Sequence, residues 1–413
     1  MNKSLILLSL LLVALTAYQV VDKTQSPQLV RKPYLQSAIA DSVSILWRTD
    51  TAIFASLAYK SAKESRWNHV TGSTKLTHTG VYENEVVLTQ LSPDTRYEYQ
   101  IFTDGRQLLS EQDLYFTSPV GVEDSVFSFF AVGDIGEPVE EEGTPDQLGE
   151  ALSHYVDSLR FGLLLGDIIY PDGKSELYDQ NLFQYFGEVF PYVPVFTVLG
   201  NHDWHEPEDN YVQEWKLPGN EHYYSFDYGH VHFIGLDTKN GEMYEYDEQL
   251  AWLKQDLSIH SGKQDWVIVF LHHNGKSCTY KKAYEGVVSL YPIFEQYKVD
   301  LVLNGHAHTY ERLQPMNGQG EIAAVDPSST HTYPHPQGFM SITIGSGGKL
   351  RGIGSDPKPW SPHPDSCQYP GLVAAYVHDW AFLALDVDGK QLVGRAITTE
   401  GLEVVDEFVI DKR

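Results

Sequence analysis

Seven side chains that could bind metal ions follow five apolar segments of this sequence. They are Asp134, Asp167, Tyr170, Asn201, His272, His306 and His308. Imidazole nitrogen combined with oxygen from carboxylate, amide and phenol groups favours iron, zinc or manganese over a metal that prefers thiolate. The set is large enough to hold two ions and to leave coordination positions open for water and substrate. It therefore predicts a binuclear metal centre.

The residues around these side chains fit that prediction. Gly133 and Gly166 each precede an aspartate and permit a tight turn there. His306 and His308 alternate across one small residue, so both rings reach the same side of an extended segment. The rings are therefore expected to serve two adjacent ions.

Taken alone, each motif has an ordinary structural explanation. A Gly-Asp pair after an apolar run is usually a turn or a helix cap, and Tyr170 by itself would be a packed aromatic residue. His273 is expected to be a structural neighbour of the ligand His272. The prediction depends on the five signatures occurring together, each behind an expected buried strand.

The elements expected to position these side chains are strands that alternate with helices. Apolar runs suited to strands buried on both faces span residues 127–136, 161–170, 193–205, 265–273 and 299–308. Helical periodicity covers residues 144–159, 177–190, 247–260 and 288–298, and the first of these has a capping box at Thr144 with proline at the first helical position. Residues 339–348 indicate a further strand with a glycine turn, and residues 381–402 indicate edge strands. This order predicts an α/β sandwich with its site at the carboxyl ends of the strands.

An all-β region precedes this sandwich, over residues 29–119. Val43, Ile45 and Trp47 alternate along one expected strand and share one face. Residues 91–97 then resemble the tyrosine-corner segment of fibronectin type III domains, in which the tyrosine hydroxyl bonds back to the preceding corner. The region is expected to be a fibronectin type III-like sandwich. It could be an adhesive module, but a spacer beside a catalytic domain is the preferred interpretation.

The N-terminus predicts export. Residues 1–21 combine a basic start, a short apolar run and small residues at its end, as in a secretory signal peptide. The apolar run is shorter than a typical transmembrane helix, although an uncleaved membrane anchor is an alternative. Residues 22–28 form a polar linker. The protein is expected to be secreted or periplasmic, without stable membrane embedding after signal cleavage.

Composition limits the partners. The chain has 413 residues, with 29 basic and 56 acidic side chains and a formal net charge of −27. That excess of negative charge disfavours a nucleic-acid partner, and the length suggests two domains or three. Cys278 and Cys367 are the two cysteines, and they could form one disulfide or remain free thiols. A bond between them would tether the loop that carries Cys278.

Five blocks of this sequence together resemble one enzyme family. They are Gly133-Asp134-Ile135-Gly136, Gly166-Asp167-Ile168-Ile169-Tyr170, Gly200-Asn201-His202-Asp203, Val269-Phe270-Leu271-His272 and Gly305-His306-Ala307-His308. Their order resembles the purple acid phosphatase branch of the calcineurin-like metallophosphoesterases, and the following Tyr310-Glu311-Arg312 is similar as well. The resemblance implies a four-layer αββα catalytic domain over residues 120–413, preceded by the β domain.

The resemblance also implies roles for individual residues. Fe(III) would be held by Asp134, Tyr170 and His308, with Asp167 bridging to a second ion. That second ion, Fe(II), Zn or Mn, would be held by Asn201, His272 and His306. A metal-bound hydroxide would attack phosphorus in line with the leaving ester oxygen. His202 would contact the substrate phosphate, and Asp203 would orient its ring.

The chain departs from the family at one catalytic position. Plant-type members carry a histidine pair nine and ten residues beyond the ligand His272, where this sequence has Lys281 and Lys282. A lysine can bind phosphate as a point charge or donate a proton when its pKa is lowered. The alternative is that both lysines are simply solvated. The resemblance implies an acidic pH optimum for activity. If a lysine is the proton donor, we expect instead a neutral or alkaline optimum.

Three functions remain open from the sequence. The leading hypothesis is a secreted phosphatase that hydrolyses small phosphate monoesters. The second is a phosphodiesterase or nucleotide hydrolase of the same fold, because the blocks set the chemistry while the loops select the leaving group. The third is an exported adhesive protein with an inert hydrolase domain, although all seven candidate ligands are present. The sequence does not determine the physiological ester or the oligomeric state.

Overall fold

The computed structural model describes residues 26–121, 126–204, 209–239, 241–243, 245–323, 331–334, 338–358, 367–369 and 371–413. The predicted signal peptide over residues 1–21 lies outside these residues, as does most of the predicted linker over residues 22–28. Within the described chain, no helix has the length and hydrophobicity needed to cross a bilayer.

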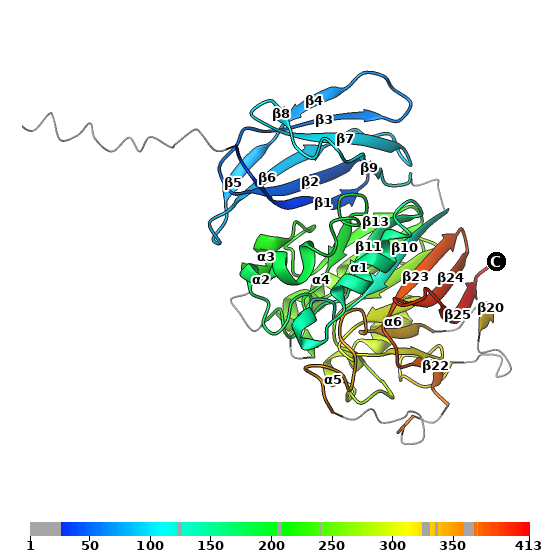
Figure 1. Ribbon diagram of the computed structural model, residues 1–413. Helices are drawn as coiled ribbons and strands as arrows, with labels where there is room; N and C mark the ends of the chain where they lie inside the picture. The colour runs from blue at the N-terminus through cyan, green and yellow to red at the C-terminus, as the bar shows by residue number, and fades with distance from the viewer. Residues whose placement is uncertain are drawn as a thin grey trace, which may run out of the picture.

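The N-terminal domain is a sandwich of two antiparallel sheets (Figure 1). The first sheet contains β1 (Leu29–Ile39), β2 (Ser42–Thr49), β6 (Tyr82–Leu88) and β5 (Ser73–Leu76), in that order. The second contains β4 (Asn68–Thr71), β3 (Ala55–Ser61), β7 (Arg96–Thr103) and β8 (Arg106–Gln107), with β9 (Leu114–Thr117) paired to β7. The Tyr97 hydroxyl accepts a hydrogen bond from the backbone N–H of Ser92 at 2.9 Å, which confirms the predicted tyrosine corner.

Strand β2 is buried on both faces rather than on the one face that its alternation predicts. Val43, Ile45 and Trp47 pack in the sandwich core as expected. The opposite face carries Arg48, whose Nη1 lies 2.9 Å from Oε2 of the catalytic-domain residue Glu214. That face is buried because it packs on the second domain (Figure 1). The pair of Arg48 and Glu214 meets the requirement that charges buried in such a contact have a partner of opposite sign.

The second domain contains two seven-stranded sheets. The first has the order β12 (Val195–Thr197), β11 (Leu159–Leu164), β10 (Val126–Val132), β23 (Ala381–Asp388), β24 (Gln391–Thr398), β25 (Val404–Asp411) and β20 (Thr332–Pro334). The second has the order β13 (Tyr224–Tyr228), β14 (Val231–Gly235), β17 (Trp266–Phe270), β18 (Leu301–Asn304), β21 (Met340–Ile344), β19 (Tyr310–Leu313) and β22 (Val373–Val377). Strands β10, β11 and β12 run parallel to one another, as do β14, β17, β18 and β21.

Aromatic side chains hold the two sheets face to face. The ring of Phe161 on β11 lies 5.0 Å from that of Phe129 on β10 and 5.2 Å from that of Phe233 on β14. Helices cover the outer faces: α1 (Pro145–Ser153) lies against the first sheet, and α4 (Tyr246–His260) contributes to the core on the far side of the second. This arrangement is the predicted αββα sandwich.

Several predicted boundaries were wrong. Helix α1 ends at Ser153, and its N-cap Thr144 makes no side-chain capping bond, although the proline stands at the predicted position. Residues 177–190 fold as the short α2 (Ser175–Tyr178), a π-helical turn and further turns, and residues 288–298 contain α6 (Tyr291–Gln296) after α5 (Glu285–Val288). Within 381–402, β23 is central rather than an edge strand, because it pairs with both β10 and β24.

Candidate active site

The structure brings all seven predicted ligands to one edge of the sandwich. Each follows the carboxyl end of a strand: β10, β11, β12, β17 or β18. In parallel sheets these ends share an edge, and here the edges of the two sheets meet. Side chains that lie far apart in the sequence therefore converge on one small volume.

The first half of the site is acidic. The Tyr170 hydroxyl lies 2.9 Å from Oδ1 of Asp134 and 2.9 Å from Oδ2 of Asp167. Nε2 of His308 lies 3.4 Å from Oδ1 of Asp134. These four side chains are buried, so they have little access to water, and a cation placed among them would neutralise their negative charge.

The second half of the site is built around His272. Its Nε2 lies 3.2 Å from Oδ1 of Asn201, 3.2 Å from Nδ1 of His306 and 3.3 Å from Oδ1 of Asp167. Asp167 thus directs one oxygen toward each half of the site. That geometry fits a carboxylate shared by two neighbouring cations.

The charges of these groups depend on one another. Burial alone would raise the pKa of Asp167, but His272 and His202 hold it well below its usual range. Burial opposes protonation of His272, yet the Asp167 carboxylate raises the pKa of that imidazole to about 9. Burial and the charges of Asp134 and Asp167 raise the pKa of the Tyr170 phenol well above its ordinary value. The buried negative charge at this site requires protons or cations to neutralise it.

The backbone is constrained where the ligands are presented. Asp134, Asp167 and His306 all have positive φ values, of 57°, 49° and 70°, a conformation that side-chain-bearing residues rarely adopt and that clusters at functional sites. Gly166 also has a positive φ, and a Cβ there would lie 2.8 Å from Cβ of His272. A Cβ on Gly133 would lie 3.1 Å from Cα of Gly305, so glycine also permits the close approach of these two loops.

An outer layer of contacts orients the histidines. Asp356 Oδ2 lies 2.8 Å from Nδ1 of His308, and the Tyr284 hydroxyl lies 2.7 Å from Nε2 of His306. The backbone carbonyl of Leu165 lies 2.8 Å from Nδ1 of His272. Such contacts fix which ring nitrogen faces a metal. Asp356 and Tyr284 could not be identified from the sequence because they follow no periodic pattern.

His202 lies at the rim of the site. Its backbone N–H donates to Oδ1 of Asp167 at 2.8 Å, and its ring Nδ1 lies 2.5 Å from the Pro171 carbonyl oxygen. Asp203 does not orient that ring as expected. Its carboxylate instead accepts backbone N–H groups, including that of Gly200 at 2.8 Å, and burial together with the charge of Asp167 raises its pKa to about 7.

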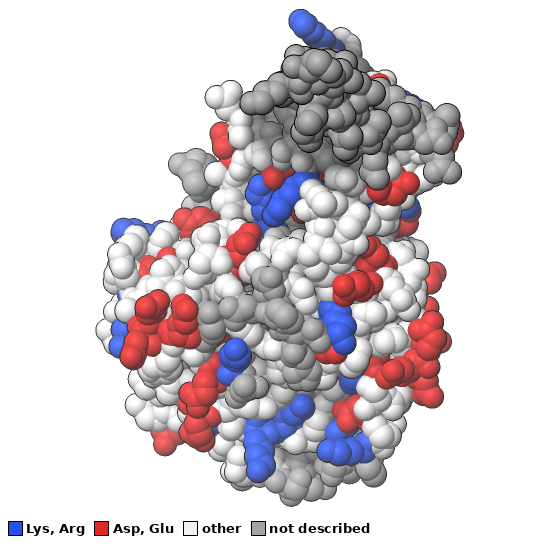
Figure 2. Space-filling model, turned by 90° about the vertical axis from the view of Figure 1, so that its left-hand side faces the viewer, with Lys and Arg blue, Asp and Glu red and all other residues white. Residues whose placement is uncertain are grey.

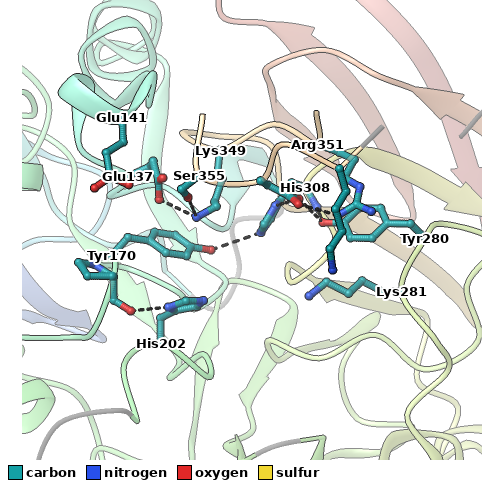
Figure 3. A pocket seen from close by; sticks show the side chains of 13 residues that line it. Glu137, Glu141, Tyr170, His202, Tyr280, Lys281, His308, Lys349, Arg351 and Ser355 are labelled. Carbon is teal, nitrogen blue, oxygen red and sulfur yellow. Dashed lines mark hydrogen bonds and ion pairs between the residues drawn. The ribbon is translucent and has the colours of Figure 1, made fainter. Parts of the chain in front are cut away.

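A pocket of about 450 Å³ opens over Tyr170, His202 and His308 (Figure 3). Lys281 lines this pocket and extends its amine inward, across from His202. Lys282 is exposed and is not among the lining residues. The structure thus brings one of the two predicted lysines to the site and leaves the other in solvent.

The loop that carries Lys281 is fixed from behind. Cys278 and Cys367 form a disulfide with a Cα–Cα distance of 5.1 Å, so the two thiols are bonded. The buried Glu311 carboxylate accepts hydrogen bonds from the Cys278 backbone N–H and the Ser277 hydroxyl, both at 2.8 Å. These contacts tether the loop. Of the two alternatives left open by the sequence, a disulfide and two free thiols, the structure has the disulfide.

Comparison with known proteins agrees with this geometry. Residues 31–118 match the N-terminal domain of purple acid phosphatases, and residues 127–310 match the calcineurin-like phosphoesterases. The chain thus combines a purple acid phosphatase N-terminal domain with a calcineurin-like phosphoesterase domain, and its curated relatives include purple acid phosphatases. Purple acid phosphatase 23 of Arabidopsis thaliana is 27% identical over 324 residues, which cover 68% of this chain and 66% of the relative.

Two further similar proteins include a solved structure and a relative described as inactive. The structure of a purple acid phosphatase from yellow lupin seeds has a TM-score of 0.77 and 20% identity, and the match covers 94% of this chain and 74% of that one. A probable inactive purple acid phosphatase of Arabidopsis thaliana is 27% identical over 380 residues, or 80% of this chain and 58% of the relative. The chain spans less than two thirds of the length of the two Arabidopsis relatives.

The donor atoms that this chain brings together suit a binuclear metal site. Two buried clusters have ligand atoms within 4.8 Å of one another: Asp134, Asp167 and His272 in one, and His272, His273 and His306 in the other. Nδ1 of His273, the expected structural neighbour, lies 3.0 Å from the Thr238 hydroxyl. Nitrogen and oxygen donors without thiolate fit iron, zinc or manganese.

Removing the disulfide is expected to loosen the loop that carries Lys281. In the double variant Cys278→Ser, Cys367→Ser, the free energy of unfolding should fall by about 2–4 kcal/mol, because the bond closes a long loop in the unfolded chain. Amide hydrogen exchange over residues 274–284 should accelerate, and the reduced native protein should behave in the same way. Unchanged exchange in that segment would show that Glu311 alone holds the loop.

The Glu311 carboxyl group is expected to make stability depend on pH. Burial raises its pKa from 4.5 to about 7, so the folded state holds a proton that the unfolded state loses. The stability associated with this proton is complete below pH 4.5 and is lost as the pH rises through about 7. Glu311→Gln should therefore gain up to about 3 kcal/mol relative to the native protein across this window. Denaturant unfolding at several pH values measures the difference, and a constant difference would contradict the assignment.

Proposed function

We propose that this protein is a secreted binuclear-metal phosphatase that hydrolyses small phosphate monoesters. The observation that carries the proposal is the convergence of seven oxygen and nitrogen donors beneath a pocket lined by His202 and Lys281. Export is supported by the apolar N-terminus and by the Cys278–Cys367 disulfide, because disulfides persist in oxidising compartments. Membrane embedding after cleavage of the signal is not part of the proposal.

Two ions would occupy the two halves of the site. The proposed ligands of Fe(III) are Asp134, Tyr170 and His308, and those of Fe(II), Zn or Mn are Asn201, His272 and His306. Asp167 would contribute to holding both ions. When bound, the pair would lower the pKa of a coordinated water and neutralise charge on the phosphoryl oxygens. Asp356 and Tyr284 would hold His308 and His306 in the required orientation.

The remaining steps belong to side chains at the rim. His202 would contact an equatorial phosphoryl oxygen, and its ring is oriented by the Pro171 carbonyl. Lys281 would protonate the leaving alkoxide or bind phosphate as a point charge. Burial lowers the pKa of the Lys281 amine, which makes this amine a better proton donor than a solvated lysine. Lys282 has no assigned role because it lies outside the pocket.

A second candidate is a phosphodiesterase or nucleotide hydrolase that uses the same metal ligands. The pocket is open enough for a larger leaving group, since its volume is about 450 Å³. On the face shown in Figure 2, acidic and basic side chains are interspersed and the basic ones do not gather into a stripe. A small ester therefore fits this surface better than a nucleic-acid polymer does.

The assignment is tested by initial rates on an aryl phosphate monoester and the matching diester between pH 4 and 10. We expect protein supplemented with iron and zinc to prefer the monoester. Asn201→Ala removes one proposed ligand and should lower kcat/KM at least about a hundredfold, with loss of one metal ion by elemental analysis. Asn68→Ala, on the exposed strand β4, serves as the matched control. Preference for the diester would transfer the assignment to the second candidate, and an inactive protein with both metals bound would support the inert alternative.

The lysine pair is tested by two matched substitutions. Lys281→Gln should lower kcat about a hundredfold on alkyl phosphates and much less on aryl phosphates, whose leaving groups need no proton. Lys282→Gln should leave kcat close to that of the native protein, because this side chain faces solvent. The native optimum should be neutral or alkaline, and the decline at high pH should disappear in Lys281→Gln. A rate maximum below pH 5 would rule out lysine as the donor.

A further inference from the structure

The pocket gathers several cationic side chains beside the carboxylates of Glu137, Glu141 and Asp356, although the chain as a whole carries a formal charge of −27. Four cationic side chains line it: Lys281, Lys349, Arg351 and Lys358. A single phosphoryl group already held by two metal ions does not require four additional cations. Their arrangement therefore calls for a separate explanation.

Lys349 is neutralised within the protein. Its Nζ lies 2.7 Å from Oε2 of Glu137, and it also contacts the Ser355 hydroxyl. Figure 3 shows Lys349 and Glu137 together with Glu141 on one side of the pocket, away from Arg351 and Lys281. This side contributes little net positive charge.

The opposite side carries an excess of positive charge. Nη1 of Arg351 pairs with Oδ1 of Asp356 at 2.6 Å, but that carboxylate also faces His308 through its other oxygen. Nε of Arg351 is buried and has no hydrogen-bond partner, and the guanidinium stacks over the Tyr280 ring at 3.9 Å. Within the described part of the chain, neither Lys281 nor Lys358 has a carboxylate ion-pair partner. We call Lys281, Arg351 and Lys358 the cationic wall.

We propose that the cationic wall binds a second anionic group on the leaving side of the substrate. The preferred substrates would then be phosphate monoesters whose alcohol carries a carboxylate or another phosphate. The inference rests on the proposed function, which places the reacting phosphate at the metal ligands and the leaving group in the pocket. The fixed, stacked guanidinium supplies directional donors, and Lys358 at the exposed rim supplies charge that attracts an incoming anion.

The proposal is tested with three substrates on the same aromatic ring: phenyl phosphate, 4-carboxyphenyl phosphate and 1,4-phenylene bisphosphate. We expect kcat/KM for at least one doubly substituted ester to exceed that for phenyl phosphate by about tenfold, beyond the factor of two that equivalent phosphates give. Comparison of the carboxylate and phosphate arms shows which anion the wall prefers. Lys358→Gln should remove most of this preference, leaving for the bisphosphate little more than the factor of two. Lys358→Arg should retain the preference. Lys254→Gln, on the exposed face of α4, controls for overall charge.

Binding is measured in parallel by calorimetry with benzylphosphonate and 4-carboxybenzylphosphonate, which are not hydrolysed. Tighter binding of the carboxylated compound, lost in Lys358→Gln, supports the wall even where turnover is absent. Turnover of phenyl phosphate with no preference in either assay would overturn the proposal and leave the phosphatase assignment intact. A preference that survives Lys358→Gln and Arg351→Lys together would also overturn it. Absence of turnover with all three esters would instead refute the proposed function.

Discussion

Two buried carboxylates that face one hydroxyl group determine much of the structure around them. Asp134 is fully buried, Asp167 is 1% exposed, and both lie 2.9 Å from the Tyr170 hydroxyl. Burying charges so close together is costly unless protons, hydrogen bonds or cations neutralise them. His272 and His308 lie against these carboxylates for that reason. The left-handed backbone at both aspartates persists because the packing around it leaves no alternative.

The fold meets this requirement by bringing two sheets together at one edge. The aromatic core around Phe161 fixes the separation of the sheets, and the glycines at the strand ends let the loops approach each other. At Gly305, a Cβ would lie 2.6 Å from Oδ2 of Asp134. The ligand loops are thus packed against one another as closely as a protein core, which suits a site that must be rigid before a metal enters it.

The sequence predicted the parts that repeat a pattern. The predicted metal ligands follow apolar strands in order, and the structure places all of them at one edge, so their type and position in the chain were sufficient to predict their convergence. Asp356 and Tyr284 could not be predicted because each reaches the site from a loop with no periodicity. The sequence also could not show that Lys281 lines the pocket while Lys282 faces solvent. Neighbouring residues in an extended loop point to opposite sides, and only the tertiary structure shows which side is the pocket.

Other failures have a common physical cause. The second buried face of β2 and the central place of β23 both depend on contacts with distant segments, which local hydrophobic patterns do not encode. The alternation along β2 correctly predicted one buried face. It could not show that the remaining face, with its buried arginine, meets Glu214 of another domain.

The position of β23 also determines the order in which the molecule can be completed. Strand β10 opens the α/β domain, yet its antiparallel neighbour comes from near the C-terminus, with Val126 opposite Asp388. During synthesis the first sheet therefore keeps an open edge at β10 until the last strands have emerged. Contacts between such distant segments also make folding slow. The nascent α/β domain therefore lacks one of the two neighbours of β10 until β23 has been synthesised.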